Sequence, residues 1–183
     1  MKAVKNGRQD WVDHALDQLK IAVGDSGLVE FLGPDATLVP VPRSAPLSKP
    51  SALWPARVIS NGLVSRGLGA AVLPCLSRVE PVRKSSTAEQ GTRPDADAHL
   101  RTIALSPEIL TTKRITLIDD VVTIGRTMIA AASHVRAAYP NADVRAFGLI
   151  HTSGLNTEID RIDAPYVGWL RRAGRYIAHD SPR

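Results

Sequence analysis

The sequence predicts an α/β fold, a three-layer sandwich with a mainly parallel central sheet and small hood or hairpin additions at the ends of the chain. Three observations support this. Short apolar strands alternate with amphipathic helical segments, which is typical of parallel sheets with helical crossovers. Only 4% of the 183 residues are aromatic, so aliphatic side chains must supply most of the core. The length suits a single domain over residues 1–183, because two halves would each bury too little apolar surface.

The first part of the chain predicts two helices and two strands. Residues 10–20 and 51–66 carry apolar side chains at helical spacing, and Gly67 is a fitting stop signal for the second helix. The runs 36–41 and 70–76 have the length and the aliphatic content of strands. We expect Trp11 and Trp54 to lie in the core, since both fall on the apolar faces of the helices.

The second part continues the alternation. Residues 102–105, 115–118 and 144–150 read as strands, and residues 126–138 read as a helix between the last two of them. Such a strand–helix–strand unit predicts parallel pairing with a right-handed crossover. The domain core is therefore expected over about residues 37–153.

Two further segments stand outside this pattern. Residues 77–99 are polar with almost nothing to bury, so we expect a long loop there, mobile over about residues 78–99. Within the tail 154–183, residues 167–178 mix aromatic and basic side chains around Gly174, which predicts a terminal hairpin.

Composition and charge limit the function classes. The 23 Lys and Arg against 18 Asp and Glu give a formal charge of +5, which suits an anionic small ligand as well as nucleic acid. The scarcity of aromatic residues weighs against a single-strand nucleic-acid platform. The lone Cys75 excludes an intramolecular disulfide and is expected to be a buried, inert thiol. The lack of a signal-like or membrane-length apolar run predicts a cytoplasmic chain with no membrane partner.

Two adjacent carboxylates follow the buried strand 115–118. Asp119 and Asp120 are expected at the carboxyl edge of the sheet, where open α/β folds bind their ligands. Carboxylate oxygens accept hydrogen bonds from the vicinal hydroxyls of a ribose and help to hold a divalent cation nearby.

A turn that opens the next helix comes directly after these carboxylates. Backbone N–H groups and the helix dipole then point at one spot, which suits a phosphate. Gly125 lets the backbone approach that phosphate, and the hydroxyls of Thr123 and Thr127 can donate to its oxygens. The candidate binding residues are Asp119, Asp120, Val121, Val122, Thr123, Ile124, Gly125, Arg126 and Thr127.

This run resembles the phosphoribosyl pyrophosphate (PRPP) motif of the type I phosphoribosyltransferase family: an apolar strand, two acidic and two apolar residues, a Thr-rich turn with Gly, and a closing Thr. Residues 39–43, Val-Pro-Val-Pro-Arg, resemble the first strand and pyrophosphate loop of the competence-protein branch of that family. Two departures stand out. Ile124 replaces a usual second Thr or Ser, and Arg126 occupies a position that is often small.

The resemblance implies a type I phosphoribosyltransferase-like fold and an enzyme that uses PRPP and Mg²⁺. Such an enzyme transfers the 5-phosphoribosyl group to an acceptor, nucleobase-like or amine, which the sequence does not identify, and releases pyrophosphate. It implies catalytic roles for Asp119, Asp120 and Lys84, with the two carboxylates holding the metal indirectly, through ribose hydroxyls or water. The implied pyrophosphate ligands are Arg43, Ser44, Arg83, Lys84 and Arg93.

Two other functions stay open, as does a homodimer. A non-catalytic PRPP or nucleotide sensor on the same fold is one, because Ile124 removes a hydroxyl donor from the motif. A nucleic-acid-associated protein is the other, through the basic residues near the ends of the chain, Lys2, Lys5, Arg8, Arg171, Arg172, Arg175 and Arg183. His99, His134 and His151 are isolated in the sequence. We expect His134 on the surface, and His151, which follows the last strand, is only a weaker candidate for the pocket mouth.

Overall fold

A four-stranded, all-parallel sheet forms the centre of the molecule, in the order β2-β1-β5-β6. The computed structural model describes residues 9–25, 27–49, 51–82, 95–110, 112–152, 167–173 and 176–179. The strands are β1 (Ala36–Pro40), β2 (Ala71–Val72), β5 (Arg114–Val122) and β6 (Asp143–His151). Parallel register is continuous across the centre: Ile118 of β5 pairs with Pro40 on one side and with Phe147 on the other. The predicted α/β class with a parallel sheet is therefore confirmed.

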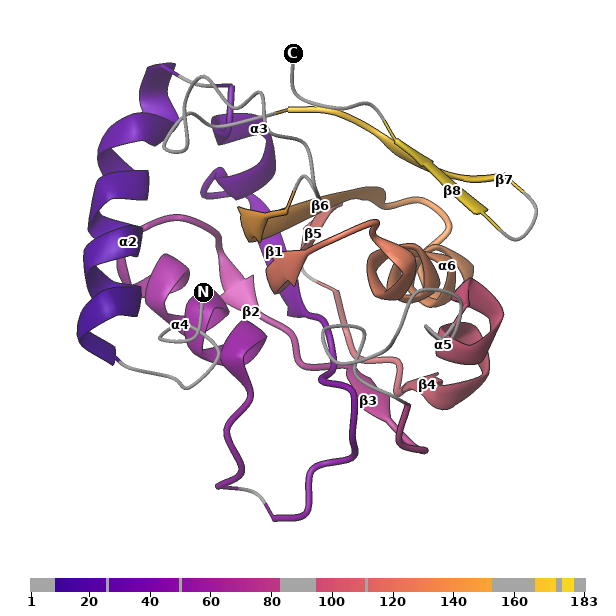
Figure 1. The fold of residues 1–183 in the computed structure, drawn as a ribbon. Helices are drawn as coiled ribbons and strands as arrows, with labels where there is room; N and C mark the ends of the chain where they lie inside the picture. The colour runs from indigo at the N-terminus through magenta and orange to yellow at the C-terminus, as the bar shows by residue number, and fades with distance from the viewer. Residues whose placement is uncertain are drawn as a thin grey trace.

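Helices and a small sheet cover the two faces of the central sheet, an arrangement compatible with a three-layer sandwich (Figure 1). On one face lies α4 (Pro55–Ser65), and α2 (Gln9–Ala22) packs on its outer side, followed by the short η1 (Val23–Asp25) and α3 (Val29–Leu32). The other face carries α6 (Arg126–Ala138), α5 (Ala96–Thr102) and the antiparallel pair of β3 (Leu76–Arg78) with β4 (Ile103–Leu105).

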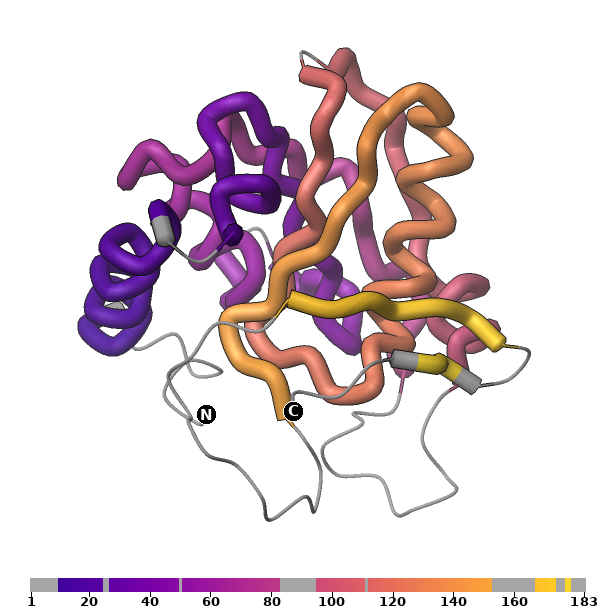
Figure 2. Tube along the Cα trace, turned by 90° about the horizontal axis from the view of Figure 1, so that it is seen from above, coloured from indigo at the N-terminus to yellow at the C-terminus, as the bar shows by residue number. Residues whose placement is uncertain are grey.

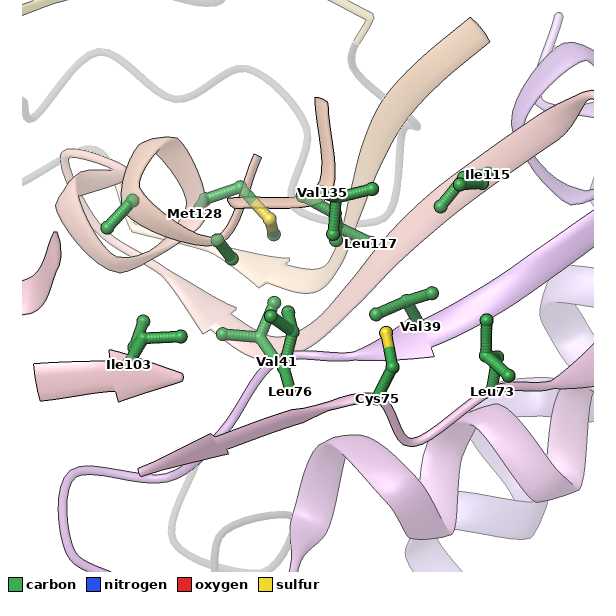
Figure 3. Packing of buried hydrophobic residues seen from close by; sticks show 12 residues of the cluster. Val39, Val41, Leu73, Cys75, Leu76, Ile103, Ile115, Leu117, Met128 and Val135 are labelled. Atoms are coloured by element: carbon green, nitrogen blue, oxygen red, sulfur yellow. The ribbon is translucent and has the colours of Figure 1, made fainter. Parts of the chain in front are cut away.

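The core divides into two clusters, one on each face of the sheet. Alternate residues of a strand point to opposite faces, so Leu38 belongs to the cluster beneath α4, and Val39 to the cluster beneath α6. Figure 3 shows the second cluster, in which Met128 and Val135 of α6 meet side chains of the central strands and of the β3 region. This aliphatic packing on both faces is what a buried parallel sheet requires.

The chain's last described elements form the predicted hairpin. Strands β7 (Leu170–Ala173) and β8 (Tyr176–His179) pair antiparallel, and Figures 1 and 2 show them beside α6. Leu170 joins the cluster beneath α6, so the tail packs against the domain at the end of the sheet where β5 leads into α6.

Several element boundaries differ from the sequence expectation. The predicted strand over 70–76 is two strands, β2 and β3, separated by a segment with Pro74, which cannot donate to a ladder. The strand expected to end at Ile118 continues to Val122, although its full burial does end at Ile118. The segment 77–99 is not all loop: β3 reaches Arg78, and α5 begins at Ala96. Residues 83–94 lie outside the described residues.

The two tryptophans expected in the core behave differently. Trp54 is buried, and its indole Nε1 donates to the carbonyl of Val41 at 2.8 Å. Trp11 is 55% exposed, which contradicts the expectation, because the buried stripe of α2 runs through Val12 and Leu16 instead. Within the described part of the chain, no helix is long and apolar enough to cross a membrane.

Candidate functional site

A small pocket opens at the carboxyl end of β5, where the chain turns into α6. It is lined by Asp119 and by residues 121–128, which include the predicted phosphate turn. Its volume is about 30 Å³, room for about two water-sized groups. The pocket therefore suits one terminal group of a ligand, such as a phosphate, rather than a whole sugar diphosphate.

Gly125 shapes the floor of this pocket. It is the N-cap of α6 with a φ of +77°, a left-handed conformation that favours glycine. A Cβ at this position would lie 2.7 Å from Cδ1 of Leu170, so strand β7 of the hairpin packs closely against the turn. The first N–H groups of a helix have no partner within that helix and carry its positive dipole end. The turn that the sequence singles out thus lies in the pocket lining at the N-terminus of α6.

The two carboxylates stand on the last, half-buried part of β5. Asp119 pairs with Gly148 of β6, and its Oδ1 accepts a hydrogen bond from the N–H of Asp120 at 2.9 Å. Among the described residues no group of three His, Cys, Asp or Glu side chains could hold a metal ion by itself. The pair Asp119 and Asp120 still fits Mg²⁺, because this ion is commonly bound by the oxygens of one or two carboxylates together with substrate phosphates and water.

A buried polar cluster lies behind the turn, and sequence reasoning did not identify it. Arg78 donates from Nε to the carbonyl of Arg43 at 3.0 Å and from Nη1 to Oγ1 of Thr102 at 2.6 Å. Its Nη2 lies 3.4 Å from Nδ1 of His99, and that same ring nitrogen lies 3.5 Å from Oγ1 of Thr127. We define Arg78, His99 and Thr102 as the Arg78 cluster. His99, isolated in sequence, is thus in contact with the phosphate turn.

Burial perturbs both ionisable groups of this cluster. Desolvation, with the nearby positive charges of Arg78 and Arg126, lowers the pKa of His99 to about 4. Desolvation also lowers the pKa of Arg78 to about 10, and the negative charge of Asp119 acts in the opposite direction by raising it. At neutral pH the imidazole is therefore neutral and the guanidinium charged. Because Arg can only donate, His99 Nδ1 accepts and Nε2 carries the proton. Nε2 is buried and has no hydrogen-bond partner among the described residues.

Of the residues expected to bind pyrophosphate, the structure describes Arg43 and Ser44, and neither lines the pocket. The side chain of Arg43 donates to the carbonyl of Leu53 at 3.0 Å, while its own carbonyl accepts from Arg78. Ser44 is half-buried, and its carbonyl accepts from the N–H of Val82 at 2.8 Å. The remaining ligands expected from the sequence, Arg83, Lys84 and Arg93, lie outside the described residues.

The other candidates take ordinary structural places. His134 is half-buried, not a surface residue as expected, and its Nε2 lies 2.9 Å from the carbonyl oxygen of Leu100. His151 is exposed at the end of β6 and does not line the pocket. Cys75 is buried, as expected, and burial raises the pKa of its thiol to about 11.

Two of the basic residues considered for nucleic-acid contact lie on β7. Arg172 forms an ion pair with Asp97 of α5 at 2.7 Å, and Arg171 lies over the ring of Trp169 at 5.7 Å. Both cations therefore have partners within the chain. The others, Lys2, Lys5, Arg8, Arg175 and Arg183, lie outside the described residues.

Taken together, the site combines the turn that opens α6, the carboxylate of Asp119 in the pocket lining with Asp120 next to it outside that lining, and the buried cation of Arg78. This set can hold a phosphate at the turn and accept hydrogen bonds from hydroxyl groups beside it. The chain matches no protein-family model and no curated protein.

Proposed function

We propose that the protein is a phosphoribosyltransferase-type enzyme that binds PRPP with Mg²⁺ and transfers its 5-phosphoribosyl group to an acceptor. One observation carries the proposal: Asp119 and the turn that begins α6 line the same pocket at the carboxyl edge of a parallel sheet. Open α/β folds bind ligands at this edge, and a sugar phosphate presents the two kinds of group that this pocket favours.

The binding roles follow from the chemistry of each part. The 5′-phosphate lies at the N-terminal turn of α6, where backbone N–H groups and the hydroxyls of Thr123 and Thr127 donate to its oxygens. The carboxylates of Asp119 and Asp120 accept from the two ribose hydroxyls and so orient the ring. Arg43, Ser44 and the basic residues of the 83–93 segment are then the candidates for the pyrophosphate.

The transfer breaks the bond between the anomeric carbon and a pyrophosphate oxygen, whose electron pair leaves with the pyrophosphate. The acceptor's nitrogen or amine lone pair forms the new bond, and its proton passes to solvent. Positive charge develops on the ribose ring, as at other glycosyl centres, and the nearby carboxylates favour it. When bound, Mg²⁺ supplies charge neutralisation at the leaving pyrophosphate. The residues of the chain mainly position the two reactants.

Binding of PRPP to a carboxylate-deficient variant tests the proposal. We expect the double variant Asp119→Asn, Asp120→Asn to lose PRPP affinity in calorimetry with MgCl₂ while keeping a cooperative thermal unfolding transition. The control is Asp35→Asn, Asp143→Asn, which makes the same charge change just before β1 and at the start of β6, the other end of the sheet. Unchanged affinity in the folded site variant, or equal loss in the control, would overturn the assignment.

A sensor remains the second candidate because of Ile124. This residue lines the pocket, where a hydroxyl donor would serve a phosphate better. A sensor binds PRPP without consuming it, whereas an enzyme releases pyrophosphate when a nucleobase or amine acceptor is supplied. A pyrophosphate-release assay over a panel of bases and ammonia therefore separates the two. Steeply salt-dependent retention on DNA or RNA, without PRPP binding, would favour the nucleic-acid alternative instead.

A further inference from the structure

The Arg78 cluster takes no direct part in the proposed transfer, yet it joins three parts of the site. Arg78 donates from Nε to the carbonyl of Arg43, which follows β1, and from Nη1 to the hydroxyl of Thr102 on α5. Through Nη2 it reaches His99, which in turn contacts Thr127 on the first turn of α6. One side chain on β3 thus links the segment after β1, helix α5 and the phosphate turn.

This arrangement is costly for a merely structural element. Arg78 is 5% exposed, and among the described residues its guanidinium bonds only to neutral groups, with no carboxylate at ion-pair distance. His99 is 3% exposed, and its Nε2 has no partner within the described part of the chain. A buried charge without an ionic partner and a buried donor without an acceptor both destabilise a fold relative to apolar packing. Local rules are broken in this way most often at functional sites.

We propose that Arg78 and His99 are positioning residues of the phosphate site, with Arg78 fixing the ring of His99 and His99 fixing the side chain of Thr127. This inference rests on the proposed function, because the ligand it serves is the phosphate monoester at the turn. Arg78 acts through its fork of donors, which reaches three acceptors at once; a lysine ammonium at the same place cannot reproduce that geometry.

The hydrogen-bond directions explain how the relay works. Nδ1 of His99 offers one lone pair, and both Arg78 and the Thr127 hydroxyl approach it, at 3.4 and 3.5 Å. Because Arg78 donates to this single lone pair, the Thr127 hydroxyl lies beside the ring and keeps its own proton for a phosphate oxygen. The Arg78–His99 bond therefore leaves Thr127 held in place and ready to donate. The charges that face His99 are those of Arg78, Arg126 and Asp95, and burial with the two arginines keeps the ring neutral.

The first test needs no ligand. Nitrogen-15 NMR of the imidazoles, with His99 assigned by its loss in His99→Gln, reports which ring nitrogen carries the proton. We expect His99 to be protonated on Nε2 at pH 7. The variants Arg78→Lys and Thr127→Val should each shift the Nδ1 resonance, because each changes a group that lies against that nitrogen. A proton on Nδ1, or a resonance that neither variant moves, would overturn the relay.

The second test measures coupling in binding, with ribose 5-phosphate as the probe. His99→Phe and Thr127→Val should each weaken its affinity by about five- to tenfold, the worth of one hydrogen bond, and the double variant should lose no more than the stronger single. His99→Phe should keep or raise the thermal midpoint, because it removes an unpaired buried donor. His134→Phe is the control, since His134 contacts Leu100 and not Thr127, and its affinity should be unchanged.

The two tests separate the possible failures. Losses that add in the double variant, or an affinity loss in His99→Phe that only accompanies unfolding, would refute the positioning role. If the wild-type protein binds neither ribose 5-phosphate nor PRPP, the proposed function fails, while the ligand-free nitrogen-15 measurement still decides whether Arg78 and Thr127 hold His99.

Discussion

Replacing Gly125 by alanine probes the phosphate turn directly. The backbone φ of +77° puts an L residue in the left-handed region, which costs about 1–2 kcal/mol. The added Cβ would also lie 2.7 and 3.0 Å from the two terminal carbons of Leu170. Because those carbons end a flexible side chain, the hairpin can give way, and we assign this overlap about 1 kcal/mol. The free energy of unfolding should therefore fall by about 2–3 kcal/mol in Gly125→Ala.

Gly67 supplies a matched control for this variant. Its φ is +78°, and no atom lies within 4 Å of the position of an added Cβ. Gly67→Ala should therefore show the backbone cost alone, about 1–2 kcal/mol. The assay is urea unfolding of both variants, each also in a Leu170→Ala background. Removing the Leu170 side chain should bring the cost of Gly125→Ala down to that of Gly67→Ala. Equal costs for the two glycines in both backgrounds would refute the contact between the hairpin and the turn.

Three further predictions concern buried groups. Trp54→Phe leaves the Val41 carbonyl without its donor and should lower the free energy of unfolding by about 1–3 kcal/mol in urea titrations; an unchanged midpoint would argue against that hydrogen bond. Cys75, with its pKa raised to about 11 by burial, should resist thiol reagents at pH 8 in the folded protein and react at once in denaturant; rapid labelling of the folded protein would contradict this. His99 has a pKa lowered from 6.5 to about 4, so its titration costs no stability above pH 6.5 and destabilises the folded state progressively as the pH falls toward 4. The loss amounts to at most about 3.4 kcal/mol, and His99→Phe should remove that part of the pH dependence in unfolding titrations.

Elements with strong local patterning could be predicted from the sequence. The helix expected over residues 126–138 has these bounds in the structure, because its apolar spacing and the glycine before it are local signals. Trp11 shows where such signals fail. Helix α2 carries two apolar stripes about 100° apart, one through Trp11 and one through Val12 and Leu16. Only the tertiary contact with α4 decides that the second stripe is the buried one. Helix α5 escaped prediction because it is seven residues long and mostly polar.

The site residues also divide into those that local sequence signals predict and those that only tertiary packing brings together. Residues 119–127 are contiguous, so the local signals of strand, turn and helix suffice to bring them together at one edge of the sheet. Arg78 and His99 carry no such signal, because each meets the turn only through tertiary packing. His99 and Thr127 are 28 positions apart, and a lone histidine in a polar segment reads as a surface residue. The Asp95 N-cap, which accepts from the N–H of Ala98, is the one local sign that the segment turns helical before His99.

Asp119 and Arg78 link the two parts of the site electrostatically. The negative charge of Asp119 acts against the desolvation of the buried Arg78, raising a pKa that burial lowers. A ligand phosphate at the turn would add negative charge on the same side and so favour the charged guanidinium further. Removing the charge of Asp119 therefore acts twice: it withdraws an acceptor for a ribose hydroxyl and leaves Arg78 less compensated. Because the ligand restores part of that compensation, inorganic phosphate at one fixed concentration should raise the thermal midpoint of Asp119→Asn more than that of the double variant Asp119→Asn, Arg78→Met. Equal rises in the two variants would contradict this link between the ligand and Arg78.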